Sequence, residues 1–429
     1  MAEPTRIPRG SDASRADPLR SPDDAPRRPA DPPRTSAPIA LLWIAQFLSQ
    51  FGDSVFLIAF IWLILDLTGS KTATGGAATI SYLPALLFGV AAGLLVDRLN
   101  RRMVMVWADA GRALLLGLCA ALYAAHGLTP AVLTAIAFAV STSSVLFYPA
   151  RDSLLPELVR GRDLIRANAW VQLSQQGAFF LGPLLAGYFI RSFGVASAFP
   201  VGALCFVGSL LFLLFLKGAG GRHRAGRATL GIVEDFRSGL RAIAADRTLV
   251  LLLGFTALDN LFIMGPAIVG NAVMVRDTLR GDASAYALVE ATYGVGMIVG
   301  SLTIGRLGGR VGFGRLLLVG ITLDGLTYVP LLFCRSLLYL VVVSFIHSLV
   351  IPVITIPRTT IVQGMVSQGL QGRVFALVNV VVVGMTALSS GLTGIALDRI
   401  SAPVLFGVIG AAATLVGLLG FLSARLRQL

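Results

Sequence analysis

The sequence is poor in charged residues and in the side chains that usually bind metals. Only 13% of its 429 residues are charged, whereas a soluble globular domain carries about a quarter. It has three histidines and three cysteines, and each cysteine (Cys119, Cys205, Cys334) lies in an apolar run without CxxC or Cys/His spacing. These shortages exclude a disulfide framework and a zinc site, and no phosphate-binding loop occurs. We therefore expect no metal, no cofactor and no enzymatic activity.

The sequence has an excess of apolar residues. Hydrophobic residues make up 55% of the chain, and its mean hydropathy is +0.80. Lipid is the simplest solvent for so much apolar surface. A net charge of +13 would suit nucleic acid, but the cations lie in loops between apolar segments. We therefore expect a lipid bilayer, and not nucleic acid, as the partner of this chain.

Residues 1–37 differ from the rest in composition. They are rich in proline, arginine and aspartate and contain no apolar stretch long enough for a signal peptide. Such a segment cannot bury enough apolar surface to offset its ordering entropy, so we expect a disordered cytoplasmic tail.

From Ile39 onward, apolar runs long enough to cross about 30 Å of hydrocarbon recur to the end of the chain. Backbone polar groups in lipid must be satisfied within the segment, which favours helices. The runs are apolar all round and do not alternate, which argues against a barrel. The sequence predicts an all-α membrane protein with twelve transmembrane helices at 39–66, 74–96, 103–125, 130–149, 168–190, 195–216, 248–275, 284–305, 314–334, 337–357, 373–397 and 401–424.

The distribution of lysine and arginine predicts the orientation. Of the 35 Lys and Arg residues, 28 lie in segments on the same side as both termini. Basic residues accumulate on the inner side of membranes, so both termini are predicted to be cytoplasmic and the location to be the inner, or plasma, membrane. The expected domains are an N-terminal six-helix bundle at 38–216, a central cytoplasmic linker at 217–247 and a C-terminal six-helix bundle at 248–429.

An internal repeat supports this division. A shift of 212 residues superposes Gly69 on Gly281 and Gly93 on Gly305. Each half has an even number of spans, so the two copies share one orientation. Parallel six-helix repeats with a central pathway are the predicted architecture.

Residues 93–102 read GLLVDRLNRR and follow the second apolar run. This loop resembles the conserved loop of the major facilitator superfamily, and the resemblance implies a cytoplasmic gating loop built from Gly93, Asp97, Arg98, Arg101 and Arg102. Asn100 stands where that family has glycine, and we expect it to keep the turn because asparagine tolerates left-handed backbone. Gly93 is expected to let two helices approach closely.

A second motif, GPLLAG at 182–187, lies in the fifth predicted helix. It is similar to the exporter-associated motif of the same superfamily, which implies a helix-5 hinge at Gly182, Pro183 and Gly187. Close helix packing without hinge motion is an equal alternative.

The start of the membrane region resembles the macrolide and siderophore (enterobactin-type) exporters within that superfamily. The residues concerned include Trp43, Gln46, Ser49, Gly52 and Asp53. The resemblance implies a secondary active transporter that works as a monomer by alternating access and exports a small amphipathic compound in exchange for protons.

Ionisable side chains inside apolar spans are costly and need a reason. Asp53 lies in the first span on a polar stripe with Gln46 and Gln50, Asp259 lies in the seventh, and Glu290 lies in the eighth. We expect these five residues to couple protons or bind substrate, with satisfied contacts between helices as the alternative.

The remaining buried charges have a structural explanation. Asp109 and Arg112 are three residues apart and are predicted to form a structural charge pair. Asp324 lies at the repeat counterpart of Arg112. His347 is expected to be a packed histidine and not a relay.

Three other functions stay open. They are an uncoupled facilitator or importer, a non-transporting membrane receptor or scaffold, and a membrane-embedded enzyme. The short loops argue against a receptor, and the absence of a clustered Ser/His, Cys/His or metal set makes an enzyme the weakest of the three.

Overall fold

The fold is known from a computed structural model that describes residues 37–159, 162–216 and 232–429. The predicted disorder of the tail lies outside this part of the chain. Within it the chain is almost entirely helical, and ten helices are long and apolar enough to cross a membrane. They are α1 (Ala37–Thr68), α3 (Arg101–Ala124), α4 (Pro130–Leu158), α6 (Ala198–Phe215) with the turn before it from Val195, α8 with its continuation (Arg247–Thr278), α10 (Ala283–Val311), α11 (Phe313–Tyr328) with its continuation to Phe333, α12 (Leu337–Met365), α13 (Gln368–Leu397) and α14 (Ala402–Gly420).

Two further helices are as long but are not among the ten, namely α2 (Lys71–Arg98) and α5 (Arg162–Phe193). Short polar turns separate successive helices, and side-chain caps fix where several of them begin. Ser70 accepts a hydrogen bond from the Ala73 amide at the start of α2, and Thr129 does the same for Val132 at the start of α4. Such caps satisfy amides that the first helical turn leaves without partners.

Several helices extend past the ends of their apolar runs. The predicted span 130–149 ends at Pro149, yet α4 continues to Leu158 with Pro149 inside it. In the same way α12 passes Pro357 and ends at Met365. The apolar run marks only the part of a helix that faces lipid, so it cannot locate a helix end that lies in water.

The predicted linker 217–247 is not all loop. Its described part forms α7 (Ile232–Ala245), which packs on α13 and α8. Arg373 of α13 donates a 2.9 Å hydrogen bond to Ser238, and Gly239 lies against Arg373 and Leu377. The linker therefore carries a helix that is fixed to the C-terminal part of the chain.

The seventh predicted span changes helix type near its middle. At Pro266 the α8 helix gives way to the π-helical segment η3 (Pro266–Gly270), then α9 (Asn271–Val273) and a second π-helical segment, η4 (Met274–Thr278). Proline has no amide hydrogen to donate, which explains why regular helix pairing stops there.

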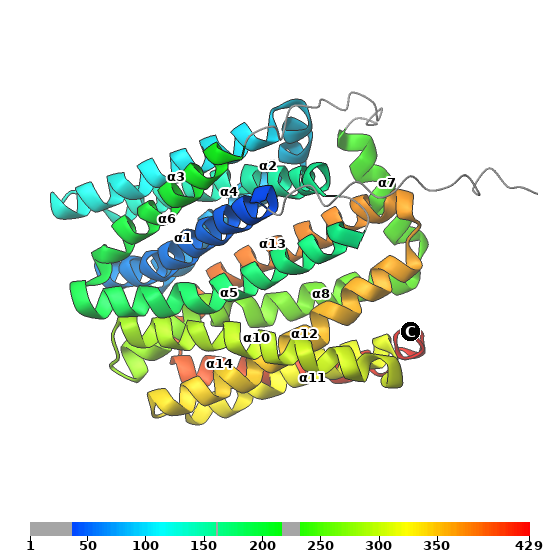
Figure 1. The fold of residues 1–429 in the computed structure, drawn as a ribbon. Coiled ribbons are helices and arrows are strands. Elements are labelled where there is room, and N and C mark those ends of the chain that lie inside the picture. Colours follow the sequence, from blue (N-terminus) through cyan, green and yellow to red (C-terminus); the bar gives the residue numbers. More distant parts are fainter. Residues whose placement is uncertain (1–36, 160–161, 217–231) are drawn as a thin grey trace, which may run out of the picture. The chain divides into compact units, whose positions relative to one another are not determined.

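For description, α1–α6 are called the N-terminal group and α8–α14 the C-terminal group below (Figure 1). Within the N-terminal group, α3 packs on α6 and α4, and α2 packs on α4. A methyl group added at Gly182 of α5 would meet Ser54 of α1, and one added at Gly52 of α1 would meet Phe206 of α6. α1 therefore packs on both α5 and α6. In the C-terminal group, α10 packs on α12, α11 on α12 and α14, and α8 on α13.

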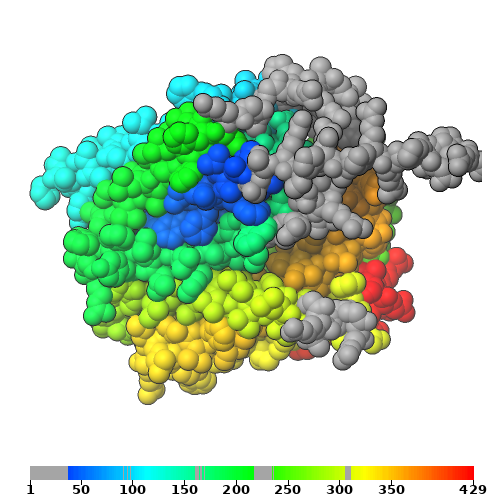
Figure 2. Space-filling view, viewed as in Figure 1, coloured from blue at the N-terminus to red at the C-terminus, as the bar shows by residue number. Residues whose placement is uncertain are grey.

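The most extensive contacts between the groups are those of α2 with α13 and of α5 with α10. Figure 2 shows α5 and α10 against each other on one face. We call the end where α1 and α13 finish and α2 begins the distal end, and the opposite end, next to α7, the α7 end. The contacts along α2 run from Lys71, which lies beside Gly394, to Leu86, which lies beside Gly384.

Candidate functional site

A guanidinium group forms the centre of a buried polar cluster in the N-terminal group. The Arg112 side chain on α3 is fully buried. Its Nη1 donates to Asp53 Oδ2 of α1 at 2.9 Å and to Ser144 of α4 at 3.3 Å, while Nη2 donates to Ser49 at 2.8 Å and to Asp109. The guanidinium also lies 4.7 Å and 4.6 Å from the ring centroids of Phe147 and Phe206. Planar guanidinium groups suit this combination of forked hydrogen bonds and ring stacking.

The two carboxylates of this cluster differ in accessibility. Asp109 is fully buried, and it accepts further hydrogen bonds from Ser49 and Ser209 at 3.1 Å and 2.5 Å. The Asp53 side chain is 23% exposed and accepts from the Tyr148 hydroxyl at 2.9 Å. Asp53 is therefore the carboxylate of this cluster that a ligand can reach.

A second polar cluster lies in the C-terminal group. Asp259 on α8 and Asp324 on α11 are both buried, and their carboxyl groups lie within hydrogen-bonding range of each other. His347 of α12 is 1% exposed, and its Nδ1 lies 3.5 Å from Asp324 Oδ1 and 2.9 Å from Thr327 Oγ1. Arg358, also on α12, acts electrostatically on Asp259. Here no guanidinium bridges the two carboxyls.

A row of polar and aromatic side chains connects this cluster to Glu290. Asn271 donates to Glu290 Oε1 at 3.1 Å and to the Tyr293 hydroxyl at 3.3 Å. The Tyr293 and Tyr328 hydroxyls are 3.4 Å apart, and the Tyr328 ring stacks on His347 with centroids 4.2 Å apart. Glu290 on α10 thus belongs to the same polar network as the two aspartates.

The two glutamines of the predicted polar stripe are buried in α1. Gln46 Nε2 donates to the Val171 carbonyl of α5 at 3.1 Å, which ties α1 to α5. Gln50 Oε1 is buried and accepts no hydrogen bond from the described residues. Gln46 Oε1 is likewise buried without a donor among the described residues, so the two glutamines differ only in the bond that Gln46 Nε2 donates to α5.

The predicted gating loop is mostly the end of α2 and the start of α3. Arg102 donates to the Leu213 and Leu214 carbonyls at 2.7 Å and 2.6 Å and so caps the end of α6, and Arg101 pairs with Glu157 of α4. Arg98 is exposed at the last residue of α2. The side chain of Asp97 lies outside the described residues.

Two expectations for this loop were wrong. Asn100 is not left-handed: its φ is −69° and its side chain caps α3 by accepting from the Met103 amide. A methyl group added at Gly93 would meet no atom within 4 Å, so Gly93 is not a site of close helix approach. Motif glycines allow close packing only where another helix passes, and the sequence does not show where that happens.

The α5 motif does lie at close contacts. A methyl group added at Gly182 would lie 2.5 Å from Ser54 Cβ of α1, and one at Gly187 would lie 3.1 Å from Ala287 Cβ of α10. Pro183 lies between them, inside α5. This stretch of α5 therefore packs on both groups.

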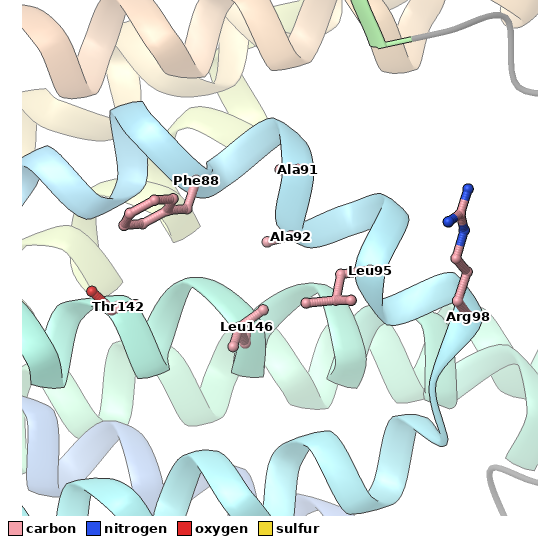
Figure 3. A pocket seen from close by; sticks show the side chains of 7 residues that line it. All are labelled: Phe88, Ala91, Ala92, Leu95, Arg98, Thr142 and Leu146. Carbon is pink, nitrogen blue, oxygen red and sulfur yellow. The ribbon is translucent and has the colours of Figure 1, made fainter.

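A cavity of about 480 Å³ lies between α2 and α4. In Figure 3, Phe88 and Leu95 of α2 and Leu146 of α4 line it, and Arg98 extends away at the end of α2. Its lining is almost entirely apolar, and it contains none of the buried carboxylates. The cavity suits an apolar group, whereas the buried ionisable side chains described above lie in the two polar clusters.

Sequence reasoning missed several members of these clusters. Tyr148 and Ser209 gave no signal, because nothing in a single sequence pairs them with Asp53 and Asp109, which are 95 and 100 positions away. Asp324 did give a signal, since it is the repeat counterpart of Arg112. His347, predicted to be a packed histidine, is packed but also contacts Asp324.

Comparison with known proteins agrees with the helical architecture. Residues 32–429 match the family of transmembrane secretion effectors within the major facilitator superfamily, and the chain belongs to that family. It is accordingly a multi-pass membrane protein, and the family is one of transporters and not of enzymes.

Among curated relatives, the multidrug efflux pump Tap of Mycobacterium tuberculosis is 33% identical over 216 residues, which is 48% of this chain and 51% of Tap. The chain thus spans about half the length of the first relatives it matches. Macrolide efflux protein A of Streptococcus pyogenes is 22% identical, over 84% of this chain and 89% of that protein.

Solved structures show the same fold at low identity. The nucleoside transporter NupG has a TM-score of 0.73 at 14% identity and covers 90% of this chain and 98% of its own. A peptide transporter, POT, in complex with sulfate has a TM-score of 0.76 at 13% identity, with coverage of 91% and 96%.

Proposed function

We propose that this protein exports a small amphipathic compound across the plasma membrane in exchange for protons, by alternating access. Twelve transmembrane helices in two parallel six-helix repeats would form the pathway, within a single monomer. The two further long helices, α2 and α5, complete the twelve. The efflux pumps among its relatives, Tap and macrolide efflux protein A, support an amphipathic cargo.

The observation that carries the proposal is the closure of the distal end. Asp66 and Lys71 of the N-terminal group pair with Arg276 and Asp277 of the C-terminal group at 3.8 Å and 3.2 Å. Thr72 donates its hydroxyl to Asp398 at 2.5 Å. Ion pairs near a surface are weak enough to break and re-form, as an alternating gate requires. A non-transporting receptor or scaffold has no need for such a layer.

The positive-inside bias supports a cytoplasmic α7 end and cytoplasmic termini. With that orientation, the contacts at the distal end would close the external side. Arg98, Arg101, Arg102, Asp97 and Gly93 would then act at the cytoplasmic side, where they control how the N-terminal group moves. Gly182, Pro183 and Gly187 would let α5 bend as the groups rock.

The partly exposed Asp53 and Gln50, whose Oε1 has no donor among the described residues, are our candidates for direct substrate contact. Asp259 and Glu290 are the candidates for proton coupling, because they lie in the network without a bridging guanidinium. Gln46 keeps α1 in place through its bond to α5. A cationic amphipathic compound would satisfy Asp53 by charge and the apolar surroundings by burial.

The test is accumulation of amphipathic dyes and antibiotics in a bacterium stripped of its major efflux pumps. Each compound is measured with and without a proton uncoupler, in cells that express the wild type, Asp259→Asn or the exposed control Glu234→Gln. We expect lower accumulation in wild-type and Glu234→Gln cells, reversed by the uncoupler and by Asp259→Asn.

Export that persists with the uncoupler and in Asp259→Asn would favour the uncoupled facilitator. Raised accumulation would favour an importer. No change across the panel, with the protein verified in the membrane, would contradict export of amphipathic compounds in general.

A further inference from the structure

We infer that Asp259 and Asp324 together hold one proton between their carboxyl groups. If the proposed function holds, this shared proton is the one exchanged for substrate. The site itself is argued from the geometry of the C-terminal group and does not depend on transport.

The two carboxyls need a proton because of how they are buried. Asp259 is 7% exposed and Asp324 is 3% exposed, and the two groups lie within hydrogen-bonding range. Oδ1 of each is buried and receives no hydrogen bond from the described residues. An ionised carboxyl can only accept, so two ionised groups here would repel without any donor between them. One shared proton supplies the donor and removes one charge.

The surrounding groups neutralise only one of the two charges. Arg358 acts on Asp259, and His347 lies 3.5 Å from Asp324. The imidazole is 1% exposed under the Tyr328 ring, and charging a ring so far from water is costly. Tyr293 and Glu290 approach from α10 but add no positive charge. The described part of α14 has no charged residue, and Arg373 of α13 is bonded to Ser238.

The internal repeat shows the same difference between the two groups. A shift of 212 residues places Asp324 at the position of Arg112. In the N-terminal group, the α3 side chain at this position is a guanidinium that donates to Asp53. In the C-terminal group, the α11 side chain is a second carboxyl that faces Asp259. A permanent cation therefore bridges the two carboxyls of the N-terminal cluster, whereas in the C-terminal cluster a removable proton would take the bridging place.

A proton fits this site better than a metal cation. Arg358 places a positive charge close to Asp259, and the Thr327 hydroxyl is engaged by His347. Few free oxygens remain for a sodium ion, which prefers several. On release, the O–H bond of the pair breaks, its electron pair stays on the carboxylate oxygen, and the proton passes to water at whichever end is open.

The test uses the purified full-length protein in detergent, without substrate. Infrared difference spectra are recorded as pH is raised, together with proton release measured by a pH-sensitive dye. We expect a band of a protonated, non-hydrated carboxyl that belongs to the aspartate pair and is lost as its proton is released, and the spectrum of Glu290→Gln identifies any separate band of Glu290. Asp259→Asn and Asp324→Asn should each abolish the band, because an asparagine amide donates to the remaining carboxylate. Glu234→Gln, an exposed change on α7, should keep it.

Asp53→Asn provides a contrast, since Arg112 neutralises Asp53, and it should keep the band as well. His347→Gln should keep the band with a shifted midpoint. If an asparagine variant does not fold, Asp324→Glu replaces it and should keep a band at a shifted midpoint, whereas an unshifted band would contradict the assignment.

A band that survives in both asparagine variants would overturn the inference, as would its loss on adding sodium at constant pH. The two proposals fail separately. A band that depends on both aspartates, without any efflux in cells, leaves the proton site in place and rejects the proposed function. Uncoupler-sensitive efflux, with a band that is unchanged in both asparagine variants, would support the proposed function and reject the shared proton.

Discussion

At the residue scale, Arg112 shows how a permanent charge is kept inside a membrane protein. It contacts carboxylates from two helices, two serine hydroxyls and two aromatic faces. A lysine has one ammonium point and cannot reproduce this planar fork. The cluster fixes α1, α3 and α4 relative to one another through a single side chain.

Replacing Arg112 with alanine should therefore destabilise the folded protein strongly. Asp109 would remain buried with no cation, and breaking a buried pair in this way costs about 3–5 kcal/mol. The melting temperature of purified protein in detergent measures the effect, with the exposed Arg241→Ala as the matched control. We expect Arg112→Lys to recover only part of the loss. Equal melting temperatures for Arg112→Ala and wild type would show that the cluster does not hold the helices together.

The sequence predicted one pair of this cluster, Asp109 with Arg112. Spacing of three along a helix places Asp109 and Arg112 on one face, so their contact follows from helix geometry. Asp53, Tyr148 and Ser209 come from other helices. Those helices are apolar on all sides, so their sequences show no periodic pattern. The sequence therefore does not indicate which of their faces pack together.

At the element scale, a glycine allows close helix packing only where the backbone of another helix passes beside it. A methyl group at Gly75 of α2 would lie 2.5 Å from the Ser390 carbonyl oxygen of α13, and one at Gly394 would lie 2.5 Å from the Lys71 carbonyl oxygen. These glycines set the distance between the two groups at the distal end. The neighbouring Gly76 meets nothing within 4 Å.

The pair Gly75→Ala and Gly76→Ala separates packing from helix propensity. Alanine is a better helix former than glycine by about 1 kcal/mol, so Gly76→Ala should be neutral or stabilising. Gly75→Ala should cost about 1–3 kcal/mol, because the backbones must move apart. Thermal melting measures stability, and labelling of a cysteine introduced at Thr79 measures opening of the α2–α13 contact. Equal effects of the two changes would refute the close approach.

The sequence was informative about helices and much less so about their ends and contacts. Apolar runs gave the location of the membrane-crossing helices, because lipid imposes that pattern on any chain. Pro149 and Pro357 suggested helix ends and instead lie inside α4 and α12. Proline only weakens a helix, and neighbouring helices can hold it together through such a point.

At the scale of the whole molecule, ion pairs and hydrogen bonds join the two groups at the distal end. Asp398 is nearly fully exposed, and hydrogen bonds from the Thr72 hydroxyl, together with nearby Lys71, hold its pKa below the ordinary value of 3.8. A carboxyl with a lowered pKa contributes its stabilisation above its ordinary pKa and loses it as pH falls through the lower one. The contact should thus be unaffected between about pH 5 and pH 8.

Acidification to pH 5 should therefore leave the Thr72–Asp398 contact closed, whereas Asp398→Asn should weaken it at every pH. Labelling of a cysteine introduced at Ser70 by a membrane-impermeant reagent reports opening of the distal end. Labelling that rises between pH 7 and pH 5 in the wild type, and not in Asp398→Asn, would make Asp398 an acid sensor and contradict this expectation.

The ion pair between Lys71 and Asp277 allows a test by charge exchange. At 3.2 Å and at the protein surface it contributes up to about 1 kcal/mol, which is about fivefold in the ratio of closed to open states. Lys71→Asp and Asp277→Lys each place like charges together and should raise labelling of the Ser70 cysteine. The double exchange restores opposite charges and should return labelling towards the wild type. High salt should reduce all of these differences, because exposed charges are screened. If the double exchange opens the distal end as much as the sum of the single changes, the pair does not act as a gate, and closure depends on the other contacts at that end.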